Sequence, residues 1–259
     1  MVKVSEVLQY LETLAPLDLQ MDFDNSGLLL GDPDREISSL LLALDVTDRV
    51  IKEAADKRCG LIVSHHPLIF HPIKNLTLRP ETRKIFELIK HGISVISFHT
   101  NLDIADGGVN DVLLSKLGAV RIDSLDHQCC GRIGEYGEEI DFPSFLALCF
   151  HTLQEKGLRY YYAGKPVKRI AVMGGAGSAA IMDAFRKNCD TYVTSDIKYH
   201  DFLLAEELKI NLIDADHFCT ENPVMFLLEN VLRARFPELS VILSQDHSGI
   251  IDFYVSSEN

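Results

Sequence analysis

Histidines that follow apolar runs are the residues of this chain best suited to chemistry. Of its ten histidines, His65 and His66 adjoin each other before Pro67, while His99 and His217 each follow another apolar run. A lone histidine at a strand end is usually a hydrogen-bonded structural residue. Two adjacent histidines before a proline differ, because the backbone turns there and both rings can reach one cleft. Imidazole nitrogens bind divalent transition metals, so these positions are candidate metal ligands.

Carboxylates stand close to these histidines in the sequence. Glu221 follows His217 by four residues at a predicted helix entrance, a spacing that places both side chains on one helix face. Asp103 ends the segment that starts at His99. Two simpler interpretations remain open: Glu221 is a first-turn carboxylate favoured by the helix dipole, and Asp103 is a turn residue before the glycines at 107–108.

Together these residues give five candidate ligands: His65, His66, Asp103, His217 and Glu221. Five ligands exceed what one tetrahedral site with an open position can use. Two ions with a bridging carboxylate, and water in the open positions, fit better. We therefore expect two divalent metal ions per chain, and zinc, manganese, iron, cobalt and nickel all suit such nitrogen and oxygen donors.

A glycine-rich loop, Gly174–Gly177, stands between a predicted strand and a predicted helix. Its G-x-G-x-x-A pattern, with Asp196 lying 21 residues after Gly175, is close to a dinucleotide-binding fingerprint. The loop can alternatively cradle a substrate phosphate or form a tight turn with close packing. We expect no dinucleotide cofactor, because the candidate metal ligands crowd the same cleft.

Short apolar runs separated by helical segments predict two βαβαβ units, each with a parallel sheet. The predicted strands cover 40–45, 61–64, 93–98, 169–173, 191–194 and 211–214. The candidate ligands follow matching strands of the two units, and ligands of parallel sheets bind outside the carboxyl ends of strands. The predicted fold is therefore α/β, with two pseudo-repeated lobes and the metal site between the carboxyl ends of their strands.

The predicted lobes divide near residue 124. The first covers 1–123, and the second covers 124–259, including a linking region at 124–166. A helix is predicted at the start of the chain, over 4–14, and two short strands at its end, over 240–243 and 250–255.

Composition narrows the function further. The chain has 259 residues and a net charge of −13, which argues against bulk binding to nucleic acid or to an anionic membrane surface. The longest stretch without a charged residue, 59–73, is 15 residues long, whereas a membrane-spanning helix needs about 20. The first 20 residues lack a secretory h-region, and the six cysteines form no C-x-x-C pair, so we expect a cytoplasmic protein.

Five motifs together resemble a known family over nearly the whole chain. They are Asp24-Asn-Ser-Gly-Leu28, Ser64-His-His-Pro-Leu-Ile-Phe70, His99-Thr-Asn-Leu-Asp103, Thr194-Ser-Asp196 with His200-Asp201, and Asp214-Ala-Asp-His217 with Thr220-Glu221. The sequence resembles the GTP cyclohydrolase 1 type 2 homologues, also called dinuclear-metal-centre hexameric or Ngg-interacting-factor-like proteins. The resemblance implies that His66 and Asp103 hold one ion, that His65 and His217 hold the other, and that Glu221 bridges them. It also implies that His99 lies near the ions, and that the chain forms a homohexamer with its metals facing an internal cavity.

Two functions follow from these expectations. The first is a metal-dependent hydrolase of a small substrate, of which a purine nucleotide such as GTP is one option, with His99 or Asp196 transferring the proton. The alternative is a non-catalytic assembly that binds metal or recruits regulatory partners. Turnover by the metal-loaded protein separates the two.

Overall fold

The computed structural model describes residues 1–128, 130–246 and 249–254. These residues form two compact units: unit 1 holds 1–108 and 224–246, and unit 2 holds 109–128, 130–223 and 249–254. A single division near residue 124 does not describe this arrangement, because the chain returns to unit 1 through a helix and a strand before its last segment rejoins unit 2.

Unit 1 contains a five-stranded sheet in the order β13-β4-β5-β6-β2. Its strands are β2 (Gly27–Leu30), β4 (Ser39–Ala43), β5 (Leu61–Ser64), β6 (Ser94–Ser97) and β13 (Ser240–Leu243). The first four strands in that order run parallel, and β2 pairs antiparallel with β6. The first predicted βαβαβ unit is therefore confirmed.

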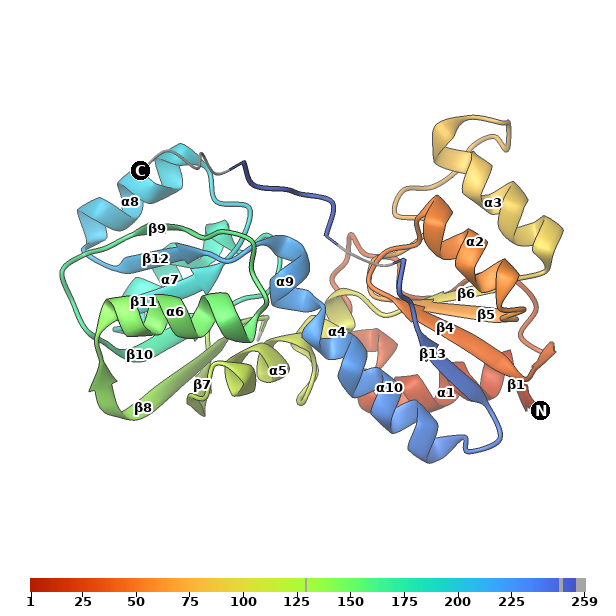
Figure 1. Cartoon of the computed structure of the whole chain (residues 1–259), viewed down its shortest axis with the longest axis horizontal. Coiled ribbons are helices and arrows are strands. Elements are labelled where there is room, and N and C mark those ends of the chain that lie inside the picture. Colours follow the sequence, from red (N-terminus) through yellow and green to blue (C-terminus); the bar gives the residue numbers. More distant parts are fainter. Residues whose placement is uncertain (129, 247–248, 255–259) are drawn as a thin grey trace. The chain divides into compact units, whose positions relative to one another are not determined.

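Helices cover both faces of this sheet (Figure 1). On one face α2 (Asp48–Asp56) and α3 (Pro80–His91) pack on Leu41 and Ile62, which are fully buried. On the other face lie α1 (Val4–Leu14), as predicted, and α10 (Pro223–Arg235), which meet where Tyr10 contacts Phe236 edge-on at 5.7 Å. The smaller elements of unit 1 are β1 (Val2–Lys3), β3 (Glu36–Ile37), η1 (Leu17–Leu19) and α4 (Thr100–Ile104).

Unit 2 contains a six-stranded sheet in the order β7-β8-β10-β11-β12-β9. Its strands are β7 (Val120–Ser124), β8 (Arg132–Ile140), β9 (Arg159–Tyr161), β10 (Val167–Val172), β11 (Thr191–Thr194) and β12 (Asn211–Asp214). The central strands β10, β11 and β12 run parallel and confirm the second βαβαβ unit. The antiparallel pair β7 and β8 was not predicted.

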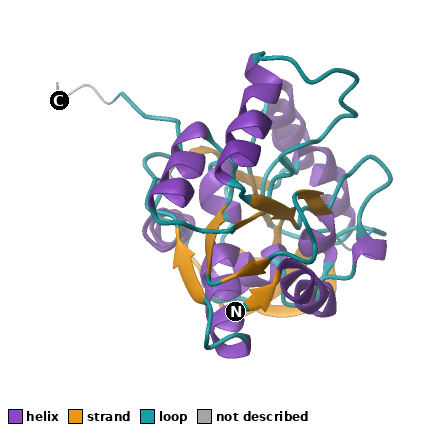
Figure 2. Cartoon of the chain, turned by 90° about the vertical axis from the view of Figure 1, so that its right-hand side faces the viewer, coloured by secondary structure: helices purple, strands orange, loops and turns teal. Residues whose placement is uncertain are grey.

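The core of unit 2 joins two helices to the central strands. Leu113 of α5 (Val109–Lys116) and Phe145 of α6 (Phe142–Thr152) pack with Val172 and Val193. Helices α7 (Ile181–Arg186) and α8 (Tyr199–Leu208) contact β11 and β12. Two short helices complete the unit, η2 (Ser178–Ala180) and α9 (His217–Glu221). Figure 2 colours the elements by type and shows helices flanking strands.

The strand predicted at 250–255 is wrong for residues 250–254, which form no regular structure, while Val255 lies outside the described residues. This segment follows the surface of unit 2, where the Lys156 ammonium donates to the carbonyl oxygen of Ile251 at 3.2 Å and to the carboxylate of Asp252 at 2.5 Å. Within the ranges that the structure describes, every helix is too short or too polar to cross a lipid bilayer.

Candidate metal centre

In unit 1 the candidate residues gather where two neighbouring strands end. His65 and His66 directly follow β5, and His99 follows β6 after one further residue. Asp103 lies on α4, the short helix that continues from β6. Because β5 and β6 are parallel neighbours, their carboxyl ends open at the same edge of the sheet, as the sequence predicts.

His65 is fixed deep within this edge. Its side chain is fully buried, and Nδ1 lies 2.8 Å from the carbonyl oxygen of Phe98. A carbonyl oxygen only accepts hydrogen bonds, so Nδ1 carries the proton and donates it. Nε2 is then the nitrogen with the lone pair, and it lies 3.5 Å from Oδ1 of Asp103. This tautomer and this neighbour suit a metal ligand.

His66 and His99 are oriented in the same way by carboxylates. Nδ1 of His66 lies 2.8 Å from Oδ1 of Asp45, and Nδ1 of His99 lies 2.8 Å from Oδ1 of Asp24. Burial opposes ionisation of Asp24, but hydrogen bonds from His99 and Thr100 outweigh it and hold the pKa of this carboxyl well below its usual range. Asp24 is therefore a fixed anion that accepts the Nδ1 proton of His99.

The three imidazoles of unit 1 converge. The centroids of the His65 and His66 rings are 5.0 Å apart, and the His99 centroid lies 5.2 Å and 5.5 Å from them. One nitrogen from each ring lies within 4.8 Å of the other two, which is close enough for all three to bind a single ion.

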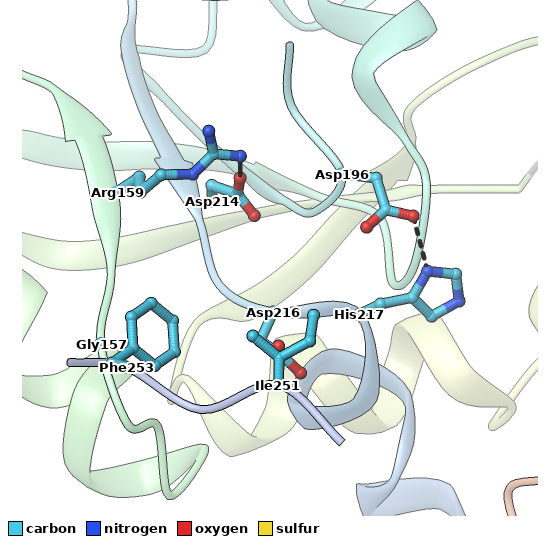
Figure 3. A pocket seen from close by; sticks show the side chains of 8 residues that line it. All are labelled: Gly157, Arg159, Asp196, Asp214, Asp216, His217, Ile251 and Phe253. Carbon is cyan, nitrogen blue, oxygen red and sulfur yellow. Dashed lines mark hydrogen bonds and ion pairs between the residues drawn. The ribbon is translucent and has the colours of Figure 1, made fainter. Parts of the chain in front are cut away.

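In unit 2 His217 lies between two carboxylates. Its Nδ1 is 2.8 Å from Oδ2 of Asp196 (Figure 3), and its Nε2 is 3.1 Å from Oε2 of Glu221. The four-residue spacing thus places His217 and Glu221 together on α9, as predicted. Burial lowers the pKa of His217, but Glu221 and Asp196 outweigh it and raise the pKa to about 9. Without metal this ring is an imidazolium, and a divalent cation at Nε2 would replace its proton with charge of the same sign.

The glycine-rich loop packs beneath Glu221. A Cβ atom on Gly175, whose φ is +65°, would lie 2.1 Å from Oε1 of Glu221. The amide groups of Gly174, Gly175 and Gly177 all donate to protein side chains, at 2.8, 3.0 and 3.0 Å. These three donors are therefore engaged within the protein, and the geometry supports the tight-turn interpretation over a phosphate cradle.

Four histidines thus share one arrangement: Nδ1 of each lies 2.8 Å from a fixed acceptor oxygen. Metal-binding histidines characteristically donate their second nitrogen to a carboxylate or carbonyl in this way, which sets the tautomer and the ring orientation. The chemistry of the donor set fits a divalent transition metal. Sequence reasoning placed Asp24 in a family motif without giving it a role, and it did not single out Asp45. Asp45 lies two residues after β4, and this position beyond a strand end is the signal that could have indicated it.

Unit 2 also contains a buried acid, Glu155, close to the residues of α9. Glu155 is 6% exposed, and within the described part of the chain neither of its carboxyl oxygens makes a hydrogen bond. Burial, reinforced by repulsion from Asp216, raises the pKa of Glu155 to about 8. Burial also raises the pKa of the neighbouring Cys219 thiol, which is therefore protonated and unreactive at neutral pH.

Comparisons with known proteins agree with these motifs. The profile of the family described as Duf34/NIF3 (NGG1p interacting factor 3) matches residues 2–248. A Clostridium perfringens protein named GTP cyclohydrolase 1 type 2 homolog is 34% identical over 97% of this chain and 100% of its own length. A Helicobacter pylori protein named GTP cyclohydrolase 1 type 2 is 32% identical, over 90% of this chain and 93% of its own length.

Solved structures show the same fold. Reduced HcgD from Methanocaldococcus jannaschii shares 32% sequence identity with this chain. Its structure matches with a TM-score of 0.85, and the match covers 94% of this chain and 98% of that one. The family model covers residues 2–248, and the Clostridium perfringens relative aligns over 97% of the chain, so the similarity spans most of both units. The chain therefore belongs to the Duf34/NIF3 family.

Proposed function

We propose that the chain is a metal-dependent hydrolase of a small substrate, and that His65, His66, Asp103, His217 and Glu221 hold two divalent ions. The shared orientation of the histidines carries this proposal. Nδ1 of His65, His66 and His217 each lies 2.8 Å from an oxygen acceptor, so that Nε2 is the atom presented for coordination. Asp103 and Glu221 are 9% and 4% exposed, so positive charge beside these buried carboxylates is favourable.

When bound, the ions would supply Lewis-acid activation of the substrate and of the attacking water. The chain's own residues would handle the proton. His99 is well placed, because Asp24 fixes its Nδ1 proton and leaves Nε2 to accept or donate. Asp24 is held in turn by Thr100, whose amide donates to Oδ2 at 2.9 Å. Asp196 contacts His217 and orients that ring, so the catalytic role predicted for Asp196 reduces to positioning in this scheme.

A purine nucleotide is the substrate class that we propose, and GTP is the first to test. The support comes from relatives: proteins named for GTP cyclohydrolase activity match this chain over most of its length. A GTP cyclohydrolase opens the purine ring by adding water, which agrees with a site built to activate water.

The test is turnover of a nucleotide panel by the chain after reconstitution with each candidate metal. We expect metal-dependent hydrolysis that His99→Ala reduces by about 100-fold, the lower end of general acid–base catalysis. The matched control is His91→Ala, because His91 lies on the exposed end of α3 in the same unit. Two bound ions without turnover of any nucleotide would instead support the non-catalytic alternative.

A further inference from the structure

A cavity of about 250 Å³ opens beside His217 within unit 2 (Figure 3). Sites for drug-sized ligands measure about 300–1,000 Å³, so this cavity suits one small ring system. Its walls come from β9, from the ends of β11 and β12, and from the segment 249–254. The function proposed above assigns no role to it.

Arg159 provides a fixed hydrogen-bond donor in this cavity. Its Nη2 donates to the carbonyl oxygen of Ile197 at 2.8 Å and to the carboxylate of Asp214. The guanidinium carbon also lies 5.6 Å from the centroid of the Phe202 ring. Among the residues that the structure describes, Nε and Nη1 of Arg159 make no hydrogen bond. A guanidinium held in this way can still donate to a carbonyl oxygen of a ligand.

Two aspartates provide acceptors on the opposite side of the cavity, as Figure 3 shows. Asp196 uses Oδ2 on His217, and Asp216 uses Oδ1 on the amide of Cys219 at 3.2 Å. Asp196 thus keeps a second oxygen for the cavity, since the described residues give it no partner there, and the Asp216 carboxylate lines the cavity beside the Cys219 thiol. With Asp214, the cavity holds three carboxylates against Arg159 and the His217 imidazolium, and this excess of one negative charge repels phosphate and attracts N–H donors.

The remaining wall is flat and apolar. Phe253 packs directly on the backbone of Gly157, where a Cβ atom would lie 2.8 Å from its Cδ1. The segment that carries Phe253 is tied down by the bonds from Lys156 to Ile251 and Asp252. An aromatic ring held at the edge of a small polar cavity is a stacking surface for a planar ligand.

We propose that this cavity recognises the ring of the substrate: a planar heterocycle with a lactam carbonyl beside N–H and amino groups, stacked on Phe253. Arg159 donates to the carbonyl, and Asp196 and Asp216 accept from the N–H and amino groups. Any phosphate of the substrate stays outside the cavity. This inference rests on the proposed function, because it places the substrate ring beside a candidate metal ligand. It defines the substrate class by the hydrogen-bonding groups on the edge of the ring.

The test is binding of nucleosides to the full-length chain, measured by calorimetry before and after treatment with a chelator. Guanosine carries the required edge, inosine lacks only the amino group, and adenosine lacks the lactam. We expect guanosine to bind in both states, inosine roughly tenfold more weakly, and adenosine and inorganic phosphate not at all. Guanosine binding that disappears with the chelator, or equal affinity for all three nucleosides, overturns the inference.

Variants give a second, independent readout. Phe253→Leu and Arg159→Gln should each weaken guanosine binding by roughly tenfold or more. The matched controls are Phe185→Leu, which alters a phenylalanine of the same 42% exposure, and Arg186→Gln, which alters an arginine paired with Asp183. Controls that lose as much affinity as the cavity variants contradict the assignment. Guanosine binding without metal-dependent turnover leaves the cavity assigned and refutes only the hydrolase proposal.

Discussion

Replacing Glu155 with glutamine should stabilise the chain, and the gain should grow as the pH rises. The pKa of Glu155 lies at about 8, above its ordinary value of 4.5. Between these two values the folded chain keeps a proton that the unfolded chain has released, so the stability of the wild-type chain falls as the pH rises through this window. Above pH 8 the folded chain carries a buried carboxylate that has no hydrogen bond among the described residues.

The size of the effect follows from the same shift. A pKa raised from 4.5 to about 8 corresponds to an upper bound of about 5 kcal/mol of destabilisation at high pH. Glutamine removes the charge but keeps a buried amide, which itself costs about 1–3 kcal/mol. We therefore expect the Glu155→Gln variant to gain roughly 2 kcal/mol at pH 9 and little at pH 5.

Glu53 is the matched control, because it is also 6% exposed but lies in the opposite environment. Burial opposes its ionisation, but hydrogen bonds from Lys57, Ser244 and the backbone outweigh this and lower its pKa to about 2. The stabilising contribution of the ionised Glu53 carboxylate to the free energy of unfolding is fully present above pH 4.5 and is lost as the pH falls toward 2. Glu53→Gln should therefore destabilise the chain at pH 7 by about 1–3 kcal/mol, because glutamine loses the hydrogen bonds that favour the charged carboxylate and solvent screens part of their energy.

The assay is urea unfolding at pH 5, 7 and 9 in the presence of a chelator. The chain has no tryptophan, so far-ultraviolet circular dichroism is the suitable signal. Glu155 lies in unit 2 and Glu53 in unit 1, so each variant reports on its own unit. Equal stability of wild-type and Glu155→Gln chains at pH 9 would refute the account of Glu155 as a buried, unsolvated acid.

Four further outcomes are expected. Glu221→Gln should remove both metals, because a bridging carboxylate neutralises both ions, whereas His65→Ala should weaken mainly one site. Elemental analysis of the metal-saturated proteins measures the number of bound ions. Two ions retained by Glu221→Gln would disprove the bridge. Gly175→Ala should lower metal affinity, since its Cβ would lie 2.1 Å from Oε1 of Glu221, and metal titration tests this against Gly137→Ala, where no atom lies within 4 Å. The purified chain should contain no dinucleotide, and a flavin absorbance band or micromolar NAD binding would contradict this. Light scattering should show a hexamer, and a stable monomer that keeps its metals would oppose it.

Most of the parallel strands could be predicted because they are buried on both faces and read as short runs that are largely apolar. Leu40–Ala43 and Leu61–Val63 are fully buried in the structure. By contrast, β8 escaped prediction because its second half is largely exposed and carries glycine and glutamate. The pairing of β13 with β4 could not be predicted either. These strands lie roughly 200 residues apart in the sequence, and no local pattern encodes so distant a partner.

The candidate site shows the same division. The spacing of His217 and Glu221 on one helix is local, and it places them together as predicted. The acceptors that orient the rings are not local: Asp24 and His99 are 75 residues apart in sequence. A single sequence does not reveal that a carboxylate in one turn will face an imidazole in another, so the residues that set the tautomers emerge only from the fold.

The pairing of β13 with β4 also has a consequence for folding during synthesis on the ribosome. When β4 (Ser39–Ala43) emerges, its outer neighbour β13 (Ser240–Leu243) has not yet been made. At about 5–20 residues per second, roughly 10–40 s pass before that strand arrives. During this interval the nascent chain carries a leucine-rich strand with one open edge, the kind of surface through which chains aggregate. Chaperone protection should therefore matter most while unit 2 is being translated.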